Sequence, residues 1–434
     1  MTATPVRIGL LGCGHVGAAF VSLVESRRAA IAARHGIDLD ITRVAVHNLS
    51  RERPVDFGEG VLTHDAHSVV NDPDIDLVVE VIGGIEPARG LILDALRSGK
   101  PVVTANKELL SNLGAELYAT AGDAGLELLF EAAVGGGIPL VRPVRESLAG
   151  EDVLRIVGIV NGTTNYVLSR MAEEQISYGE ALAEAQELGY AERDPTADVE
   201  GFDAGSKAAI LASIAFGVDV VAGDVYREGI SELTAADLAF AERLGYVVKL
   251  LAIAEKIDGD DGTEVAVRVH PAMVPAHHPL AAVRDSYNAV FVEGAAAGNL
   301  MFFGRGAGGD PTASAVLGDV IDAALNLGNG RASRLSKLAP ATVRPIDELE
   351  SQYYINLDLS DRPGALATLA GVFGDHGVSI RSMEQEGLGA EARVVLITHL
   401  ARESDVQTTL ATIRDLEVVD RVGSVLRVVG DDEG

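Results

Sequence analysis

A short glycine-rich segment near the start of the chain limits what this part of the sequence can fold into. The apolar run VRIGLL is followed directly by GCGHVGAAF, in which Gly12, Gly14 and Gly17 form a G-x-G-x-x-G pattern. Between a strand and a helix, this pattern gives a tight turn, a close backbone approach to a pyrophosphate and a helix N-terminus directed at it. A glycine triplet alone is weak evidence, so its meaning depends on the sequence that follows.

Apolar runs alternate with helical stretches in that following sequence. ITRVAV, DIDLVVEVIGG, KPVVTANKELL and LELLFEAAVGGG read as successive parallel strands with helices between them. We therefore predict an α/β fold for the chain, beginning with a doubly wound, Rossmann-type dinucleotide-binding domain over residues 1–135. Cys13, the only cysteine, lies inside the loop and reads as a small residue that fits under a phosphate. The predicted cofactor contacts of this loop are Gly12, Cys13, Gly14, His15, Val16 and Gly17.

The end of the second predicted strand indicates which nicotinamide cofactor is preferred. NAD enzymes usually place Asp or Glu there to bind the ribose 2′-hydroxyl. This chain reads HNLSRER over residues 47–53, with no acid at the strand tip and with Arg51 and Arg53 nearby. A guanidinium is suited to a 2′-phosphate because it can bind two oxygens at once. We expect NADP to be preferred and NAD to be usable, unless both arginines are only solvated.

Lys107 follows the apolar strand PVVTA, with Asn106 as the expected cap of the next helix. Ligands of doubly wound sheets bind beyond the carboxyl ends of the strands, so this lysine is expected to face the binding crevice. A cation near a helix N-terminus is unfavourable, and a solvated lysine is therefore the weaker interpretation. The position indicates a role in binding a ligand.

Lys207 lies in a second unusual setting. Asp194-Pro195 reads as the start of a helix that continues to Phe216, and on it Asp203 and Lys207 are four residues apart on one face. An ordinary solvated pair is the simple interpretation. However, the nine residues after Lys207 carry no charge, which indicates a buried helix, and burying an ammonium costs several kcal/mol, as an order of magnitude. The sequence therefore favours a functional lysine.

Charge and composition exclude several classes of protein. A length of 434 residues suits two or three domains, and a formal net charge of −29 argues against nucleic-acid or anionic-membrane partners. One cysteine suits a reducing compartment, and the N-terminus does not read as a secretion signal. No uncharged apolar stretch reaches the roughly 18 residues of a membrane span. We expect a soluble, cytoplasmic protein.

The segment that contains Lys207 also carries a long and irregular pattern. The spacing of Ala185, Gly189, Tyr190, Asp194-Pro195, Asp198-Val199, Gly201, Asp203 and Lys207 resembles the signature of homoserine dehydrogenases. Residues 104–107 resemble the TANK-type segment of the same family. The resemblance implies NAD(P)-dependent interconversion of L-homoserine and L-aspartate 4-semialdehyde. The alternative is a sensor that binds a nucleotide and an amino acid without turnover.

This resemblance implies roles for individual residues. Lys207 would donate and accept the proton, while Lys107 would orient the substrate beside the nicotinamide. Glu192 and Asp203 would bind the substrate ammonium, and Asp198 would either support Lys207 or be a charge at a helix start. The substrate-binding set is Gly162, Thr163, Tyr190, Glu192, Asp198 and Asp203. The cofactor set includes, beyond the glycine loop and the two arginines, Thr104, Lys107, Gly189 and Gly304.

The glycine-rich turn after Glu131 matches a site where the family holds a monovalent cation, usually sodium. Carried over, the ligands are the Glu131 carboxylate region and the backbone carbonyls of Val134, Gly136 and Ile138. Hard oxygen donors at a turn suit a hard cation. The spacing alone fits a hinge between domains almost equally well. Such a cation would be structural.

The last part of the chain shows a separate pattern. After a linker at 338–351, residues 352–430 follow the order βαββαβ with a D-R-P-G loop, and they resemble the ACT domain, a ferredoxin-like regulatory module. By that analogy Asp361 and Gly364 contact an effector, with L-threonine expected and L-isoleucine as the second choice. The alternative is an oligomerisation element that has lost its ligand.

The middle of the chain, residues 136–310, is predicted to be an α+β catalytic and dimerisation domain, a sheet covered by helices. Residues 311–335 are expected to pack back on the first domain. The resemblance implies a homodimer or homotetramer, which sequence alone does not show.

Overall fold

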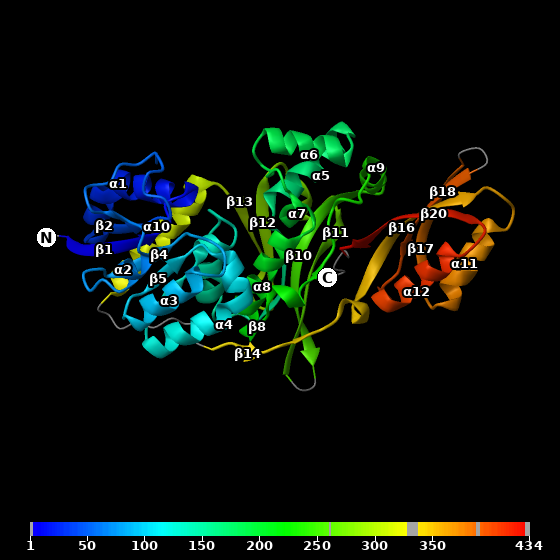
Figure 1. Cartoon of the computed structure of the whole chain (residues 1–434). Coiled ribbons are helices and arrows are strands. Elements are labelled where there is room, and N and C mark those ends of the chain that lie inside the picture. Colours follow the sequence, from blue (N-terminus) through cyan, green and yellow to red (C-terminus); the bar gives the residue numbers. More distant parts are fainter. Residues whose placement is uncertain (1–2, 260–261, 328–336, 388–390, 430–434) are drawn as a thin grey trace.

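The molecule is a row of three parts, with the N-terminal and C-terminal parts on opposite sides of the central one (Figure 1). This computed structural model describes residues 3–259, 262–327, 337–387 and 391–429. None of the helices in these ranges is both long enough and apolar enough to cross a membrane.

A parallel sheet forms the core of the N-terminal part. Among the described residues it has six strands in the order β3-β2-β1-β4-β5-β6, and all neighbouring strands are parallel. This order is that of the dinucleotide-binding fold, so the predicted doubly wound sheet is confirmed. The strands are β1 (Thr4–Leu11), β2 (Ile37–Ala45), β3 (Leu62–Thr63), β4 (Leu77–Glu80), β5 (Val102–Thr104) and β6 (Leu128–Leu129).

Helices cover both faces of this sheet. One face packs against α1 (His15–His35) and α10 (Gly309–Asn326), which share an apolar cluster with β1 and β2. The other face packs against α2 (Ala66–Val70), α3 (Ala88–Arg97) and α4 (Lys107–Ala124). Because α10 follows the central part in sequence, the chain returns to the first sheet through Ala313, Val316 and Val320. Residues 328–335 of the predicted returning segment lie outside the described residues.

A mixed sheet forms the central part. In the described ranges its order is β13-β12-β7-β10-β11. These strands are β7 (Val153–Ile159), β10 (Tyr246–Gly259), β11 (Gly262–Pro275), β12 (Tyr287–Gly294) and β13 (Gly298–Arg305). Helices α5 (Gly162–Glu174) and α8 (Phe202–Phe216) pack on one face, and the short η4 (Pro279–Ala282) covers apolar residues of the other. Shorter elements are η1 (Glu131–Ala133), η2 (Pro143–Ser147), α6 (Tyr178–Glu187), α7 (Thr196–Val199), β8 (Val218–Asp219), η3 (Ala222–Asp224), β9 (Tyr226–Arg227) and α9 (Ala235–Arg243).

The predicted helix from Asp194-Pro195 to Phe216 is wrong in one respect. The structure has two helices there, α7 and α8, and Gly201 lies between them with a φ of 78°. A side chain at Gly201 would press against Val269 of β11, so this turn needs glycine for both space and conformation. The Asp194 carboxylate accepts a hydrogen bond from the Thr196 N–H at the start of α7.

The C-terminal part has the predicted βαββαβ order. Its elements are β16 (Glu350–Ser360), α11 (Ala365–Asp375), β17 (Ile380–Gly387), β18 (Glu391–Thr398), α12 (Glu403–Arg414) and β20 (Val419–Val428). The segment before β16 carries β14 (Ala339–Pro340), β15 (Thr342–Val343) and η5 (Ile346–Glu348), and its two strands pair with β8 and β11 of the central part. β19 (Ala401–Arg402) is a short strand paired with β16. The end of β20 pairs in parallel with β11, with Ala272 opposite Arg427. The sequence did not predict this continuous sheet through two parts of the molecule.

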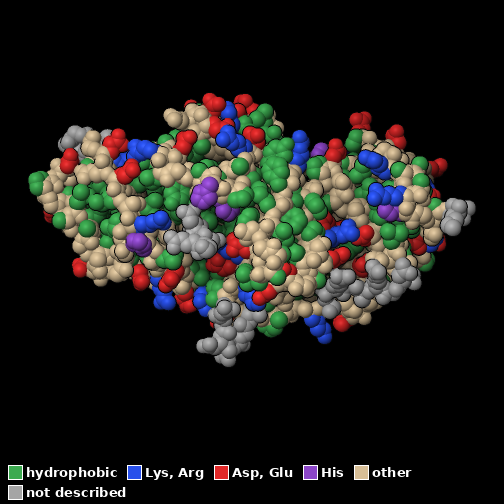
Figure 2. All heavy atoms as spheres, turned by 180° about the vertical axis from the view of Figure 1, so that it is seen from behind, with side chains coloured by type: hydrophobic (Ala, Val, Ile, Leu, Met, Phe, Trp, Pro, Cys, Tyr) green, Lys and Arg blue, Asp and Glu red, His purple; other side chains and the backbone are tan. Residues whose placement is uncertain are grey.

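The large negative charge is carried at the surface. On the back of the molecule, acidic side chains gather along the upper and lower edges, and hydrophobic side chains spread over the middle (Figure 2). The visible lysine and arginine side chains of this face are scattered among the acids (Figure 2). The charge of −29 therefore lies mainly in exposed acids, where water solvates it.

Candidate active site

A cavity of about 730 Å³ lies where the N-terminal and central parts meet. Its walls come from the start of α5, the segment between α6 and α8, and two loops of the central sheet, at 285–288 and 305–308. The sequence-predicted residues that line it are Lys107, Gly162, Thr163, Gly189, Tyr190, Glu192, Asp198, Asp203 and Lys207. The fold thus gathers the predicted catalytic and substrate-binding residues in one place.

Two lysines from different parts of the molecule share one carboxylate in this cavity. Lys207 on α8 is buried, and its ammonium donates to Asp203 Oδ2 at 2.7 Å and to the Val160 carbonyl at 2.7 Å. Lys107, the first residue of α4, donates to the other carboxylate oxygen, Asp203 Oδ1. Lys107 remains 46% exposed, whereas Asp203 is 6% exposed. The carboxylate therefore joins a buried ammonium to one that faces the cavity.

The two ammoniums differ in their affinity for protons. Burial lowers the pKa of Lys207 from its ordinary value, and Asp203 does not fully offset this loss of hydration. Burial also acts on Lys107, but the attraction of Asp203 outweighs it, so the pKa of Lys107 is raised. Burial disfavours the charge of Asp203 as well, yet the two lysines hold the pKa of that carboxyl well below its usual range. Lys207 is consequently the group that gives up a proton more easily.

Asn161 organises this cluster, and the sequence analysis did not identify it. Its Nδ2 donates to Asp198 at 2.7 Å and to Asp203 at 2.9 Å, while its Oδ1 caps α5 by accepting from the Thr164 N–H. The available signal was its place between a strand and a helix, where Asn is a preferred cap. Burial raises the pKa of the Asp198 carboxyl despite this hydrogen bond.

The remaining substrate-side residues form the outer part of the cavity. Tyr190 is half exposed, and its ring lies 5.0 Å from that of Tyr166. Thr163, in the first turn of α5, donates its hydroxyl to the Tyr190 carbonyl. Glu192 is exposed, and none of the described residues pairs with its carboxylate. Glu192 is therefore available to a cation in the cavity.

The predicted glycine loop has the geometry that a dinucleotide needs. Gly12 has a φ of 97°, and a side chain there would meet the Val81 carbonyl oxygen at 2.8 Å. A side chain at Gly17 would collide with the carbonyl of Gly12, whereas one at Gly14 would meet no described atom within 4 Å. Gly14 is also the N-cap of α1, so open space lies directly in front of the helix N-terminus.

Other predicted loop residues are placed around this turn. Cys13 is half-buried, and burial raises the pKa of its thiol. His15 and Val16 are the first two residues of α1, and the His15 ring lies against Gly309 at the start of α10. Arg53 donates to the backbone carbonyls of Arg51 and Asn48. The Arg51 guanidinium is exposed and has no partner among the described residues. The two arginines are thus not equivalent.

A second cavity, of about 320 Å³, continues from the first toward the N-terminal sheet. Lys107, Lys207, Gly306 and Ala307 line both cavities. Thr104, predicted to contact the cofactor, lies behind its wall and donates to the buried Glu80. The other Glu80 oxygen accepts from the Ile82 and Gly83 N–H groups. Glu80, which the sequence analysis missed, therefore holds the loop at the end of β4 in place.

Two residues predicted to contact the cofactor, Gly189 and Gly304, lie away from the glycine loop. Gly189 lines the larger cavity beside Tyr190. Gly304 lines neither cavity and packs against Ile138, whereas the next loop residues, 305–308, form the cavity wall. Sequence spacing did not distinguish residue 304 from its neighbours.

The predicted cation site is a buried turn. The Glu131 carboxylate accepts from three N–H groups, those of Leu140, Val141 and Arg142, so it is not free to act as a ligand. In the described ranges no hydrogen bond ends on the carbonyls of Val134, Gly136 or Ile138. Carbonyl oxygens left unpaired inside a protein are what a monovalent cation needs. The turn therefore fits a cation held by backbone oxygens, without the Glu131 carboxylate.

The predicted effector residues lie at a separate cavity of about 380 Å³ in the C-terminal part. Asp361 and Gly364 line it together with the loop between β16 and α11. Gly364 has a φ of 90° and is the N-cap of α11, so the helix N-terminus opens into this loop. Such a position attracts an anionic group.

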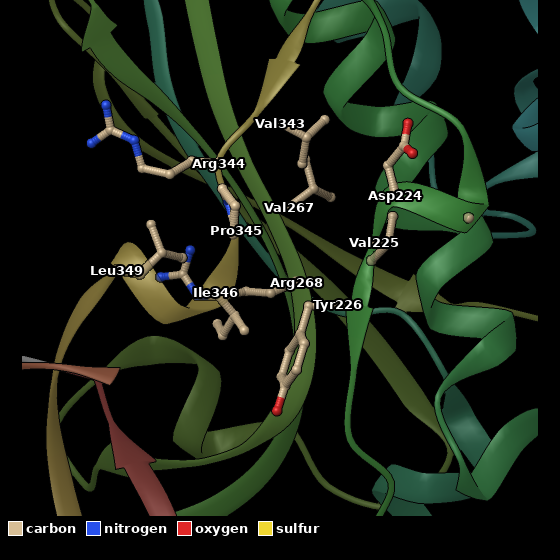
Figure 3. Close-up of a pocket in the computed structure, with 11 residues that line it drawn as sticks. Asp224, Val225, Tyr226, Val267, Arg268, Val343, Arg344, Pro345, Ile346 and Leu349 are labelled. Atoms are coloured by element: carbon tan, nitrogen blue, oxygen red, sulfur yellow. The ribbon is translucent and has the colours of Figure 1, made fainter. Parts of the chain in front are cut away.

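A fourth cavity, of about 310 Å³, lies where the segment 343–349 crosses β9 and β11 on its way to the C-terminal part (Figure 3). None of the sequence-predicted site residues lines it. Its buried Arg268 donates to Glu255 at 2.6 Å, and Arg344 pairs with Glu264. The positive charges of this cavity are thus neutralised within the protein.

Both parts of the chain that form the cavity containing Lys207 match a known protein family. Residues 139–321 match the family described as homoserine dehydrogenase, and residues 12–131 match its NAD-binding domain. A homoserine dehydrogenase of Mycobacterium tuberculosis is 49% identical to the chain, over 98% of each sequence. The chain belongs to the homoserine dehydrogenase family. Like other members of that family it is an NAD(P)-dependent oxidoreductase, and residues 353–418 match the ACT domain.

Solved structures agree with this assignment. The crystal structure of a homoserine dehydrogenase from Thiobacillus denitrificans superimposes with a TM-score of 0.91 at 38% identity, covering 99% of both chains. A hyperthermophilic archaeal homoserine dehydrogenase in complex with NADPH has a TM-score of 0.61 and 26% identity, and it covers 74% of this chain. The family resemblance and the predicted fold class are confirmed.

Proposed function

We propose that the cavity between the N-terminal and central parts interconverts L-homoserine and L-aspartate 4-semialdehyde. The observation that carries this proposal is the Lys107–Asp203–Lys207 cluster, which lies where the two cavities join. One cavity is lined by the segments that follow β4 and β5 of the N-terminal sheet and suits the nicotinamide end of the cofactor. The other is lined by the carboxylates and the helix N-terminus that an amino acid requires.

Lys207 is the proposed proton carrier. In the oxidation of homoserine, the hydroxyl proton passes to the Lys207 nitrogen, and the C–H electron pair leaves as hydride. The oxidised nicotinamide, when bound, accepts that hydride. Lys207 must be unprotonated to accept the proton, and its lowered pKa favours this state. The more strongly protonated Lys107 donates a hydrogen bond that orients the substrate oxygen.

The substrate's charged ends have separate partners. Glu192 and Asp198, together with Asp203, provide the negative charge that an α-ammonium needs. The N-terminus of α5, at Gly162 and Thr163, offers backbone N–H groups to the α-carboxylate. Asp203 already joins both lysines, so we assign it the further role of holding them at a fixed separation.

For the cofactor we propose a preference for NADP. The support is that no acid lies at the tip of β2, where NAD enzymes carry one, and that Arg51 is exposed in the loop that follows. We also propose a structural monovalent cation at the turn of Val134, Gly136 and Ile138, held by backbone carbonyls. Sodium is the expected ion because the family resemblance implies it, and backbone oxygens suit a hard cation.

The ACT domain is proposed to bind L-threonine through the loop of Asp361 and Gly364. The support is the open N-terminus of α11 at the cavity of this loop. Assembly into a homodimer or homotetramer is likewise a proposal, and light scattering of the purified protein tests it. If threonine titration gives neither inhibition nor heat of binding, the ACT domain is an assembly element instead.

The direct test of the main proposal is an absorbance assay at the reduced-nicotinamide band, with homoserine and either NADP or NAD. We expect homoserine-dependent reduction of the cofactor. Binding of cofactor and amino acid without any reduction would identify the chain as a sensor.

A further inference from the structure

A second buried lysine lies in the central domain and takes no part in the proposed chemistry. Lys249 is on β10 and is 2% exposed. Its ammonium donates to Asn165 Oδ1 at 2.8 Å and to the carbonyl of Val283. Both acceptors are neutral oxygens, so no carboxylate offsets the burial of this charge through a hydrogen bond. An aliphatic residue would fill a strand position of this kind at lower cost, so the ammonium calls for an explanation.

Asn165 links Lys249 to a whole loop segment, because it bonds to Lys249 and to several carbonyls of that segment. It lies on α5, 1% exposed, and its Nδ2 is within hydrogen-bond distance of three backbone carbonyls. These belong to Val283 at 3.3 Å, Asp285 at 2.9 Å and Tyr287 at 3.2 Å. Alternate carbonyls of one short segment therefore converge on a single pair of side chains. Without the pair, three backbone carbonyls would lose these donors, and that of Val283 is buried.

The segment that this pair holds, residues 283–288, forms one wall of the larger cavity. Asp285, Ser286, Tyr287 and Asn288 line that cavity. Asp285 has a φ of 53°, which an aspartate adopts only when its surroundings hold it there. The Ser286 carbonyl lies so close to Gly162 that a side chain at residue 162 would meet it at 2.6 Å. The segment is thus seated against the α5 N-terminus.

We propose that Lys249 and Asn165 are a positioning pair that fixes the 283–288 segment against the α5 N-terminus and thereby sets the affinity for homoserine. This inference rests on the proposed function, because it takes the α5 N-terminus as the seat of the substrate carboxylate. The pair touches neither substrate nor cofactor. It acts through the backbone that shapes the cavity.

The charges around Lys249 agree with a fixed structural ammonium. Its pKa is lowered to about 8: burial is the main cause and the exposed Arg284 adds to it, while Glu173 and Asp285 partly offset both. Arg284 and Glu173 pair with each other at 2.9 Å, at the edge of the same segment. At neutral pH the ammonium therefore remains protonated and keeps its donors directed at the two oxygens.

The test compares two substitutions on the same strand. Lys249→Met keeps the length of the side chain and removes the donors. Lys256→Met makes the same change at the exposed end of β10, where Lys256 pairs with Asp152, and serves as the control. Steady-state assays measure the KM for homoserine, the KM for NADP and kcat, and fluorescence titration measures NADPH binding. We expect the homoserine KM of Lys249→Met to rise about tenfold or more, with NADPH affinity within about twofold of wild type.

Several outcomes decide between this inference and its alternatives. A Lys249→Met variant that melts earlier but keeps the wild-type homoserine KM would overturn it, because the pair would then only stabilise the fold. If that variant does not fold, Lys249→Gln replaces it, and a homoserine KM raised about threefold is expected because one amide donor remains. An unchanged KM in Lys249→Gln contradicts the inference too. If the wild-type protein itself fails to oxidise homoserine, the proposed function fails first, and the two failures are thereby distinguished.

Discussion

The central domain meets each of its two neighbours through a cluster of charged side chains, and the charges of the two clusters are arranged in opposite ways. Toward the N-terminal part, one carboxylate, Asp203, lies between two ammoniums and borders a cavity. Toward the ACT domain, one guanidinium, Arg427, lies between two carboxylates, those of Glu228 and Glu403 at 2.9 and 2.8 Å. The first junction leaves an ammonium with a lowered pKa, whereas the second raises the pKa of its guanidinium.

The difference shows how similar charged side chains can make one junction chemically reactive and the other purely structural. Arg427 has its charge balanced by two acids, and the hydroxyls of Tyr226 and Tyr353 bond to these acids in turn. Each of these groups is held by hydrogen bonds within the cluster. Tyr226 lines the cavity of Figure 3, but no member of the cluster lines the cavity that contains Lys207. Lys207 shares with Lys107 the one carboxylate to which it donates a hydrogen bond among the described residues, and burial still lowers its pKa. A lysine with a lowered pKa that lines a cavity can exchange a proton with a ligand bound there.

The largest expected effect comes from breaking the reactive junction. Lys207→Ala should lower kcat by roughly 10²–10⁴, the usual range for loss of a general acid–base group. NADPH affinity should change little, because the glycine loop lies in another part of the molecule. Steady-state assays and fluorescence titration measure the two quantities. Turnover close to wild type would show that Lys207 is only a structural partner of Asp203.

Breaking the fixed junction should affect stability instead. Arg427→Met leaves the buried carboxylate of Glu403 and the partly exposed one of Glu228 without their cation, and losing one partner of a buried pair costs about 3–5 kcal/mol. We expect lower stability in denaturant titrations, with kcat per folded molecule near wild type. Arg421→Met changes an exposed arginine on the same strand and is the control. If Arg427→Met lowered kcat as much as Lys207→Ala does, the second junction would not be purely structural.

The pH dependence of turnover sharpens the comparison further. Because burial lowers the pKa of Lys207, kcat for homoserine oxidation should rise with pH and level off below the ordinary lysine pKa of about 10.4. Asp203 holds the proton on Lys207 by its charge, so Asp203→Asn should move the midpoint to lower pH. The kcat of each protein is measured at saturating substrates across the pH range. A midpoint that moves upward in Asp203→Asn would contradict the proposed role of the carboxylate.

Sequence reasoning succeeded where the relevant contacts are local. The i,i+4 spacing of Asp203 and Lys207 places them on one face of a helix, and the structure shows that ion pair. The strand and helix patterns of the N-terminal and ACT domains are equally local, and both folds were predicted. Homology extended this reasoning to the grouping of site residues around one cavity.

What sequence reasoning missed depends on contacts between distant residues. Lys107 and Asp203 are 96 positions apart, and Arg427 and Glu228 are 199 apart, so no periodicity connects them. The break at Gly201 also follows from packing against β11, which a local helix pattern does not contain. The pairing of β20 with β11 has the same origin. Patterns along the chain predicted the elements, and the junctions between domains had to be observed.

The smallest expected effect concerns the outer end of the cofactor site, where no buried charge takes part. Arg51 is exposed and has no partner among the described residues, whereas Arg53 is bound to carbonyls of its own loop. Arg51→Ala should therefore lower the preference for NADP over NAD by several-fold, in keeping with an exposed ion pair worth about 1 kcal/mol or less. Arg53→Ala should act mainly through loop stability and affect both cofactors alike. The ratio of kcat/KM for NADP to that for NAD is the measurement, taken at two salt concentrations because added salt screens an exposed charge. An unchanged ratio in Arg51→Ala would show that the 2′-phosphate is recognised elsewhere.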